Sequence, residues 1–174
     1  MCWVICCSCS CFIYGDCFVK KLSQEIIKLL KKKRLKLSVV ESCTGGMLSS
    51  TITSVSGSSK VFTMGLVTYS NISKNRLLRV PMKVIKRHGA VSIQCCLSMV
   101  KNLSRISRSN ISVSITGIAG PGGGSKKKPV GLVYIGLIKG PKIRANKFII
   151  KNNGRSFIQK TIVKKSLKLI KEIV

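Results

Sequence analysis

Three short segments of this 174-residue chain combine hydroxyl, thiol, amine and glycine residues in ways that can support chemistry. The first, Glu41–Gly46 (ESCTGG), follows an apolar stretch and precedes a helical pattern, which predicts a strand-to-helix turn. The first amides of a helix lack partners within the helix, so such a turn can bind a phosphate or stabilise an oxyanion. Ser42, Cys43 and Thr44 place two hydroxyls and a thiol there. On this motif alone, the simpler interpretation is that the hydroxyls only cap the helix.

A lysine is the residue that could activate such a serine. Lys74 follows Tyr69 and Asn71 at the start of the next helical pattern. A serine nucleophile needs a base, and the chain offers His88 or a lysine but only 4 Asp and Glu. A lysine serves as a base when desolvation or nearby positive charge lowers its pKa, so a Ser–Lys pair is possible. The alternative is a surface lysine. A Ser-His-Asp triad is hard to build, because Asp16 is the only Asp.

The third segment is a glycine-rich loop, Thr116–Gly124 (TGIAGPGGG), which follows another apolar stretch. Its exposed backbone amides could wrap a phosphate or a nucleotide. The loop matches neither the P-loop nor the dinucleotide fingerprint, and a flexible connection is the alternative. Further on, Arg155 precedes the last helical pattern, where an arginine can bind phosphate bidentately or simply be solvated.

The stretches that would position these residues alternate between strand and helix patterns. Helices are expected over 21–34, 47–53, 71–78, 81–89, 93–107 and 156–173, and strands over 35–40, 61–69, 111–116, 130–138 and 143–150. Asn71 and Ser92 can cap the helices that follow them. This alternation favours helices on both faces of one sheet, and the adjacent late strands make the sheet mixed. We therefore expect an α/β fold, a three-layer α/β/α sandwich with a mixed central sheet.

The charge balance is strongly basic, with 32 Lys and Arg against 4 Asp and Glu and a net charge of +28. Nucleic-acid binding is one interpretation, and attraction of an anionic small substrate is a second. A third is compositional drift that solvates the surface, which we favour because the basic residues are spread along the whole chain. Aromatic residues are 5%, few for a stacking platform, so a nucleic-acid partner is not expected. No apolar run reaches the roughly 20 residues of a membrane span, so no membrane association is expected either.

The cysteines crowd at the amino terminus, where six of the nine lie at positions 2, 6, 7, 9, 11 and 17. Their spacing matches no paired zinc pattern and no histidine is nearby, so no metal site is expected. We expect residues 1–18 to be a Cys-rich extension outside the fold, and residues 19–174 to form one domain.

Taken in order, several motifs resemble the CinA C-terminal domain family, known as nicotinamide-nucleotide amidohydrolase. They are ESCTGG (41–46), GSSKVF with GLVTYSN and Lys74 (57–74), RHGAVS (87–92), TGIAGPGGG (116–124) and KPVGLVYIGL (128–137). The resemblance runs from about Leu22 to the end and is to the stand-alone form of the domain. It implies a three-layer α/β fold and a cytoplasmic homo-oligomer that needs no metal or cofactor. The implied activity is hydrolysis of nicotinamide mononucleotide to nicotinate mononucleotide and ammonia, in pyridine nucleotide recycling. The alternative is a non-catalytic nucleotide-binding module of the same fold.

The resemblance also assigns roles to individual residues. It makes Ser42 the nucleophile, with the amides of Cys43–Gly46 as candidates for the oxyanion hole. Lys74 would be the base, and Tyr69 and Asn71 would position it or the substrate. The implied substrate-binding residues are Thr44, Gly45, Gly46, Asn71, Thr116, Gly117, Gly120, Gly122, Gly123 and Arg155, the last of which would meet the phosphate. Two features depart from the family: Gly154 stands where an acidic residue is frequent, and Lys126–Lys128 is unusually basic.

Overall fold

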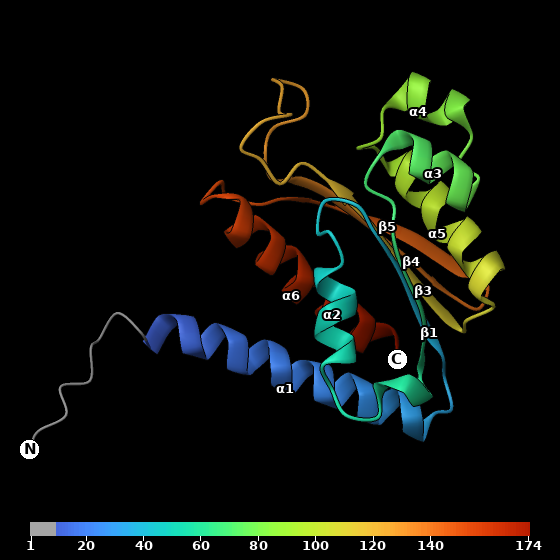
Figure 1. Ribbon diagram of the computed structural model, residues 1–174, viewed down its shortest axis with the longest axis vertical. Helices are drawn as coiled ribbons and strands as arrows, with labels where there is room; N and C mark the ends of the chain where they lie inside the picture. Colours follow the sequence, from blue (N-terminus) through green and yellow to red (C-terminus); the bar gives the residue numbers. More distant parts are fainter. Residues whose placement is uncertain (1–9) are drawn as a thin grey trace, which may run out of the picture.

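A mixed five-stranded sheet forms the centre of the protein (Figure 1). The computed structural model describes residues 10–174, with side chains from residue 17. The strands are β1 (Leu37–Glu41), β2 (Phe62–Val67), β3 (Ile111–Gly117), β4 (Leu132–Lys139) and β5 (Lys142–Ile149). The helices are α1 (Ser10–Lys32), α2 (Met47–Thr53), α3 (Asn71–Leu78), α4 (Met82–His88), α5 (Ile93–Ser107) and α6 (Arg155–Ile173), with a short 3-10 turn at Ser58–Lys60.

The strand order β2-β1-β3-β4-β5 divides the sheet into two halves. β1 pairs in parallel with β2 and with β3, whereas β3–β4 and β4–β5 are antiparallel. The carboxyl ends of β1, β2 and β3 therefore meet at one edge of the sheet. In open α/β sheets, ligands bind in the crevice at that edge, so the topology already indicates where a site would lie.

Helices cover both faces of this sheet. α1, α2 and α6 lie on one face and α3, α4 and α5 on the other (Figure 1). The predicted α/β class with a mixed sheet is confirmed. Strand β3 shows why both faces are covered, because its residues alternate in direction. Ile111, Val113 and Ile115 belong to the core shared with α6, whereas Ser114 turns to α5 and donates to the carbonyl of Cys96 at 2.8 Å.

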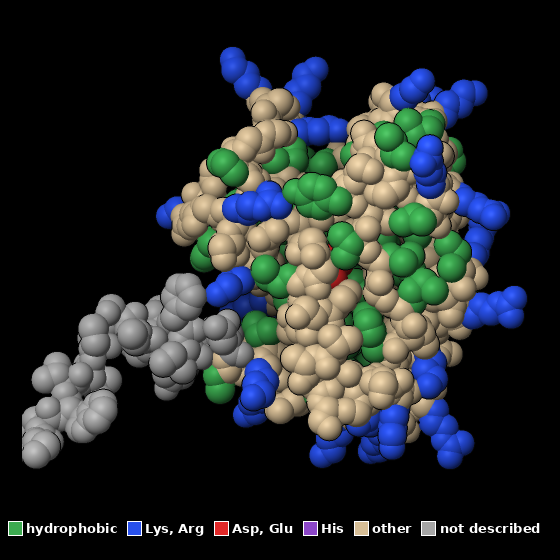
Figure 2. Space-filling model, viewed as in Figure 1, with side chains coloured by type: hydrophobic (Ala, Val, Ile, Leu, Met, Phe, Trp, Pro, Cys, Tyr) green, Lys and Arg blue, Asp and Glu red, His purple; other side chains and the backbone are tan. Residues whose placement is uncertain are grey.

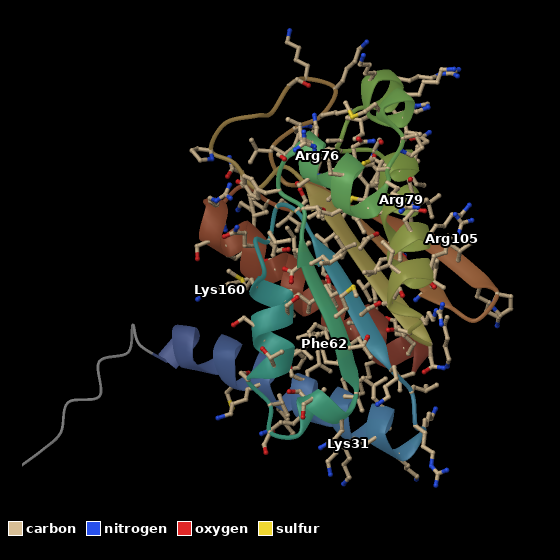
Figure 3. All side chains as sticks on the ribbon, turned by 45° about the vertical axis from the view of Figure 1, so that its right-hand side comes forward. Lys31, Phe62, Arg76, Arg79, Arg105 and Lys160 are labelled. Carbon is tan, nitrogen blue, oxygen red and sulfur yellow. The ribbon has the colours of Figure 1, made fainter. Side chains whose placement is uncertain are left out.

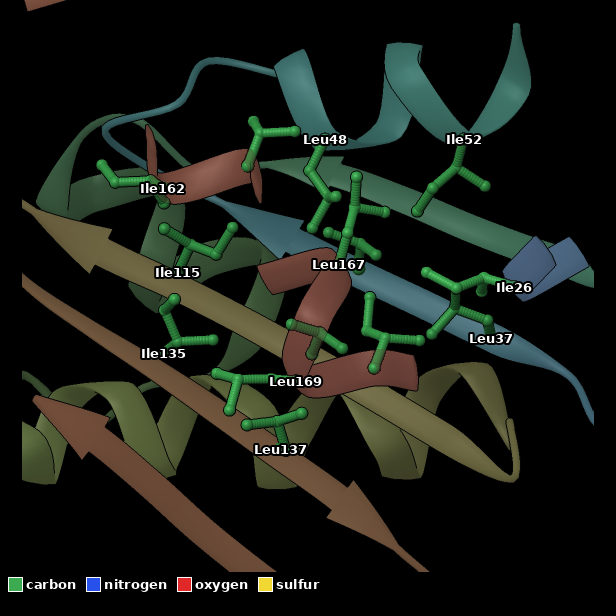
Figure 4. Packing of buried hydrophobic residues seen from close by; sticks show 14 of the residues in the cluster. Ile26, Leu37, Leu48, Ile52, Ile115, Ile135, Leu137, Ile162, Leu167 and Leu169 are labelled. Atoms are coloured by element: carbon green, nitrogen blue, oxygen red, sulfur yellow. The ribbon is translucent and has the colours of Figure 1, made fainter. Parts of the chain in front are cut away.

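The larger apolar core lies between the sheet and the first group of helices. Figure 4 shows Ile26 of α1, Leu48 of α2 and Leu167 of α6 gathered over Leu37 and Ile115 of the strands. All five side chains have no exposed surface. Burial of this kind contributes roughly 1.5–3 kcal/mol per large aliphatic side chain. α6, and with it the first turn of that helix, is thereby held firmly against the sheet.

The starts of two helices depart from the predictions in ways that matter for the domain and for the site. The first helix begins at Ser10 rather than at Lys21, so it crosses the expected start of the domain. The predicted cap at Asn71 is wrong, because Ser70 caps α3. The Ser70 hydroxyl accepts from the Ser73 amide at 3.0 Å and the Ser73 hydroxyl accepts from the Ser70 amide at 3.1 Å. This reciprocal capping box satisfies both amides, and no pattern of charge or hydropathy signalled it.

The basic side chains are dispersed over the surface. Figure 2 shows Lys and Arg around the whole outline of the face in view, and Figure 3 places Lys31 on α1, Arg105 on α5 and Lys160 on α6. Two ion pairs occur among the described side chains, Arg144–Glu172 and Lys171–Glu25. Within residues 10–174, no helix is long and apolar enough to cross a membrane.

Candidate active site

A cleft of about 240 Å³ opens where the carboxyl ends of the three parallel strands meet the start of α6. Its lining comes from the turn after β1, the segment after β2, the turn before α5, the glycine loop after β3 and the first turn of α6. The lining residues are Ser42, Cys43, Tyr69, Asn71, Lys74, Ala90, Val91, Thr116, Gly117, Ile118, Ala119, Gly120, Gly122, Gly123 and Arg155. None of them is acidic.

A serine and a lysine are in direct contact at the bottom of this cleft. Lys74 Nζ lies 2.9 Å from Ser42 Oγ, and the two side chains are only 1% and 8% exposed. They reach each other from different elements, since Ser42 follows β1 and Lys74 lies in the first turn of α3. A nucleophile and its base must be within hydrogen-bond reach, and this pair meets that requirement.

Two backbone carbonyls hold the lysine in place. Lys74 Nζ donates to the carbonyl oxygens of Thr68 at 2.8 Å and Tyr69 at 3.3 Å, both at the end of β2. A neutral amine can keep those two bonds and turn its lone pair to the Ser42 hydroxyl. Burial of the ammonium lowers the pKa of Lys74, because the charged form loses solvation. The environment therefore favours the form of lysine that can accept a proton.

The start of α2 is occupied by a carboxylate of the protein itself. The Glu41 side chain has no exposed surface and accepts from the amides of Leu48 at 3.0 Å and Ser49 at 2.8 Å, and from the Ser49 hydroxyl at 2.7 Å. Neither Ser42 nor Thr44 caps this helix, whose N-cap is Gly46. The amides of Leu48 and Ser49 are thus not available to a phosphate or an oxyanion.

The glycine loop forms the opposite wall of the cleft. Gly120 has φ +77°, a conformation that L side chains rarely adopt, and a Cβ there would lie 2.7 Å from the Val130 side chain. Arg155 Nη1 donates to the Gly120 carbonyl at 2.9 Å, and Nη2 donates to the Tyr69 hydroxyl at 2.9 Å. Arg155 therefore joins the glycine loop to the segment after β2, with N–H groups left over for a ligand.

Ten of the predicted site residues line the cleft, and three do not. Thr44, Gly45 and Gly46 line a separate hollow beside Lys20 of α1 and Met47. The Gly45 amide, one of the candidates for the oxyanion hole, donates to the Ser42 carbonyl at 3.1 Å and is therefore already used within the turn. Thr116 lines the cleft, and its hydroxyl donates to the Ala90 carbonyl at 2.9 Å. His88, the other base considered, does not line it.

One contact was missed by the sequence patterns. Gln159, one turn into α6, donates from Nε2 to the Cys43 carbonyl at 2.8 Å. A half-buried glutamine in a helix carries no sequence signal of such a contact.

Metal binding was considered from the crowded cysteines, and those at positions 2–11 lie outside the described side chains. Residues 17–174 contain no group of three or more His, Cys, Asp and Glu side chains that could hold a metal ion.

Comparison with known proteins finds close relatives of this arrangement. Residues 19–174 match the family model described as the CinA C-terminal domain. The chain is 49% identical over 138 residues to a Caldicellulosiruptor bescii protein whose name describes it as competence-damage inducible, covering 79% of this chain and 33% of that protein. It thus spans about a third of the length of the curated relatives it matches.

Solved structures share the fold over nearly their whole length. A competence/damage inducible protein from Agrobacterium tumefaciens superposes with a TM-score of 0.85 at 37% identity, covering 87% of this chain and 93% of that one. A CinA superfamily protein from Escherichia coli superposes with a TM-score of 0.86 at 24% identity, covering 90% of each chain. The second comparison concerns the fold alone.

Proposed function

The chain belongs to the CinA C-terminal domain family, and from that premise we propose that it hydrolyses the carboxamide of nicotinamide mononucleotide, giving nicotinate mononucleotide and ammonia. The family resemblance noted from the sequence is confirmed. The family supplies the reaction and the substrate, and the cleft supplies residues suited to them. Since the match covers only about a third of the length of the first curated relatives, the proposal concerns this domain and not the whole of those longer proteins.

The observation that carries the proposal is the 2.9 Å contact between Ser42 Oγ and Lys74 Nζ in a buried cleft. A hydroxyl at its ordinary pKa is a weak nucleophile, and an adjacent base is the usual means of activation. Burial lowers the pKa of Lys74, so the base needed for amide hydrolysis is present without a histidine or a carboxylate. The 240 Å³ cleft gives a carboxamide room to approach the serine, with the bulkier nucleotide portion left towards the open side and the glycine loop.

The reaction proceeds in two balanced steps. Ser42 Oγ attacks the carboxamide carbon while Lys74 Nζ takes the hydroxyl proton; collapse of the tetrahedral adduct then breaks the C–N bond, and the Lys74 ammonium returns its proton to the departing ammonia. An ester to Ser42 remains. Water then attacks the ester with Lys74 as base, releasing the carboxylate and restoring the serine. Among the amides of Cys43–Gly46, that of Cys43 belongs to the residue that lines the cleft, and it is the candidate for the oxyanion hole.

The proposal is tested by ammonia release from nicotinamide mononucleotide with purified protein in EDTA, with Ser42→Ala as the comparison. Release should persist in EDTA and fall by at least about 10³-fold in the variant, because the covalent route is lost. Cys43→Ser is a matched control, since it changes the neighbouring nucleophile and leaves Ser42 in place. Undiminished release from Ser42→Ala would rule out Ser42 as the nucleophile.

A non-catalytic nucleotide-binding module is the second candidate, and Arg155 is the observation that favours it. Its guanidinium is already bonded to Gly120 and Tyr69, and Gly154 precedes it instead of an acidic residue. This candidate predicts binding of the mononucleotide by calorimetry without any ammonia release. Binding together with release would exclude it.

A further inference from the structure

The first turn of α6 reaches all three strand ends that build the cleft. Gln159 bonds to the turn after β1, and Arg155 bonds both to the segment after β2 and to the glycine loop after β3. The two residues are four positions apart, so they lie on one face of the helix. Because Ile158 and Ile162 of the same helix are fully buried in the core, this face is rigidly placed.

Ser42 is held on both sides by backbone contacts, and Gln159 adds a third contact from far along the chain. The Ser42 amide donates to the Ile115 carbonyl of β3 at 3.0 Å, and the Ser42 carbonyl accepts from the Gly45 amide at 3.1 Å. The next carbonyl, that of Cys43, accepts from Gln159 Nε2 at 2.8 Å. The first two contacts are local or belong to the sheet, whereas the third crosses 116 positions of sequence.

The third contact controls the orientation of a peptide plane. The Cys43–Thr44 peptide is planar, so holding its carbonyl also fixes the Thr44 N–H, which points the opposite way. It thereby limits rotation about the backbone bonds that link this peptide to Ser42. The two local backbone bonds of the turn run from the Gly45 amide to the Ser42 carbonyl at 3.1 Å and from the Met47 amide to the Thr44 carbonyl at 3.2 Å, and neither involves the Cys43 carbonyl or the Thr44 amide.

We propose that Gln159 is a positioning residue that holds the nucleophile turn through the Cys43 carbonyl, so that Ser42 Oγ stays within reach of Lys74 Nζ and of the carboxamide. The proposal rests on the amidase function proposed above. Gln159 does not line the cleft, so its role is separate from substrate binding. Arg155 bonds to Gly120 and Tyr69 on the other walls of the cleft, whereas Gln159 bonds to the Cys43 carbonyl.

The proposal is tested by variants that remove the side-chain N–H donor at position 159 or replace it with another donor. Gln159→Leu keeps the bulk and loses the amide N–H, Gln159→Lys keeps an N–H donor of similar reach, and Ser156→Ala is an exposed control on the same turn of α6. Two quantities are measured on folded protein: kcat and KM for ammonia release from nicotinamide mononucleotide, and hydrogen exchange of the amides between residues 42 and 47.

Gln159→Leu should lower kcat by about 10- to 100-fold, the cost of misplacing a reacting group by a fraction of an ångström to an ångström, with KM within about threefold of the wild-type value. The same variant should exchange the amides at 42–47 faster. Gln159→Lys should recover most of both losses, and Ser156→Ala should match the wild type in both.

Three results would overturn the inference: wild-type kcat and exchange in Gln159→Leu, a rise in KM with kcat unchanged, or equal losses in Ser156→Ala. If Gln159→Leu does not fold, Gln159→Lys decides, because a positioning role requires it to keep kcat. The exchange measurement does not depend on turnover. A wild-type protein that releases no ammonia would refute the amidase function, while faster exchange in Gln159→Leu would still support the hold on the turn.

Discussion

The carboxyl end of β1 and the first turn of α3 each bury one charged side chain, and the two side chains have contrasting partners. Glu41 has no exposed surface, and its three bonds all go to residues of α2, two backbone amides and one hydroxyl. Lys74 is 1% exposed, and its bonds go to two carbonyls at the end of β2 and to the hydroxyl of Ser42 after β1. Depth of burial therefore does not distinguish a structural charge from a candidate for catalysis.

The difference lies in what the partners can do. All three donors around Glu41, two backbone amides and the Ser49 hydroxyl, belong to one short helix, so the carboxylate fixes the start of α2 on the sheet. Lys74 links two elements and faces a group that can lose a proton. A buried charge is thus a candidate for catalysis when one of its partners is a nucleophile that lines a cleft, as Ser42 does, and a structural group when all its partners belong to one helix outside the cleft, as those of Glu41 do.

Replacing Lys74 should have the largest effect on activity. Lys74→Met keeps the length of the side chain and removes the base, so kcat/KM should fall by about 10²–10⁴-fold. The protein should stay folded, because the variant also removes the cost of burying an ammonium. Ammonia release and thermal unfolding are measured on the same sample, with the exposed Lys83→Met as control. Near-normal turnover in Lys74→Met would mean that Ser42 obtains its base elsewhere.

Replacing Glu41 should have the converse effect, on stability. Glu41→Gln keeps the shape but turns an N–H group towards the amides of α2, so the free energy of unfolding should fall by about 2–4 kcal/mol. Glu172→Gln breaks an exposed pair with Arg144 and should cost no more than about 1 kcal/mol. Denaturant titration compares the two. If both variants lost the same free energy of unfolding, Glu41 would have no special structural role, and the difference drawn between Glu41 and Lys74 would be wrong.

The smallest expected effect is the pH dependence of kcat/KM and of the free energy of unfolding. Burial lowers the pKa of Lys74 below its usual 10.5, and only the neutral amine can take the serine proton, so kcat/KM should rise with pH through the lowered pKa and then level off. Between the lowered pKa and 10.5 the unfolded chain binds more protons than the folded one, so the free energy of unfolding also rises with pH there.

Lys74→Met provides the reference for this pH dependence. The rise in unfolding free energy should be present in the wild type and absent in Lys74→Met, each followed by denaturant titration at several pH values above neutral. A rise of the same size in both proteins would assign the effect to another group.

Much of the local structure could be predicted from the sequence. Alternating apolar stretches and helical patterns located the five strands and the main helices to within a few residues, because burial on one or two faces imposes a period on the side chains. The glycine-rich segments marked the turns at which the cleft forms. The start of α1 and the cap of α3 were misplaced, since the first depends on packing and the second on a reciprocal pair of serines.

The candidate site was predictable as a set of motifs and only partly as a geometry. Ser42, Lys74 and the glycine loop were chosen from motifs, and they line one cleft. Thr44, Gly45 and Gly46 belong to the same motif as Ser42 but line another hollow, because the chain reverses direction within the turn. Gln159 could not be found, since its partner is 116 positions away.

The sequence by itself determined the elements, the turns between them and the residue types available for chemistry, because these depend on period, propensity and side-chain identity over a few neighbouring residues. Only the tertiary structure decided which of those residues meet. The order β2-β1-β3 brings three distant strand ends to one edge, α3 turns Lys74 onto Ser42, and α6 carries Gln159 and Arg155 across them. Contacts over such separations follow from how the layers pack, which no local pattern encodes.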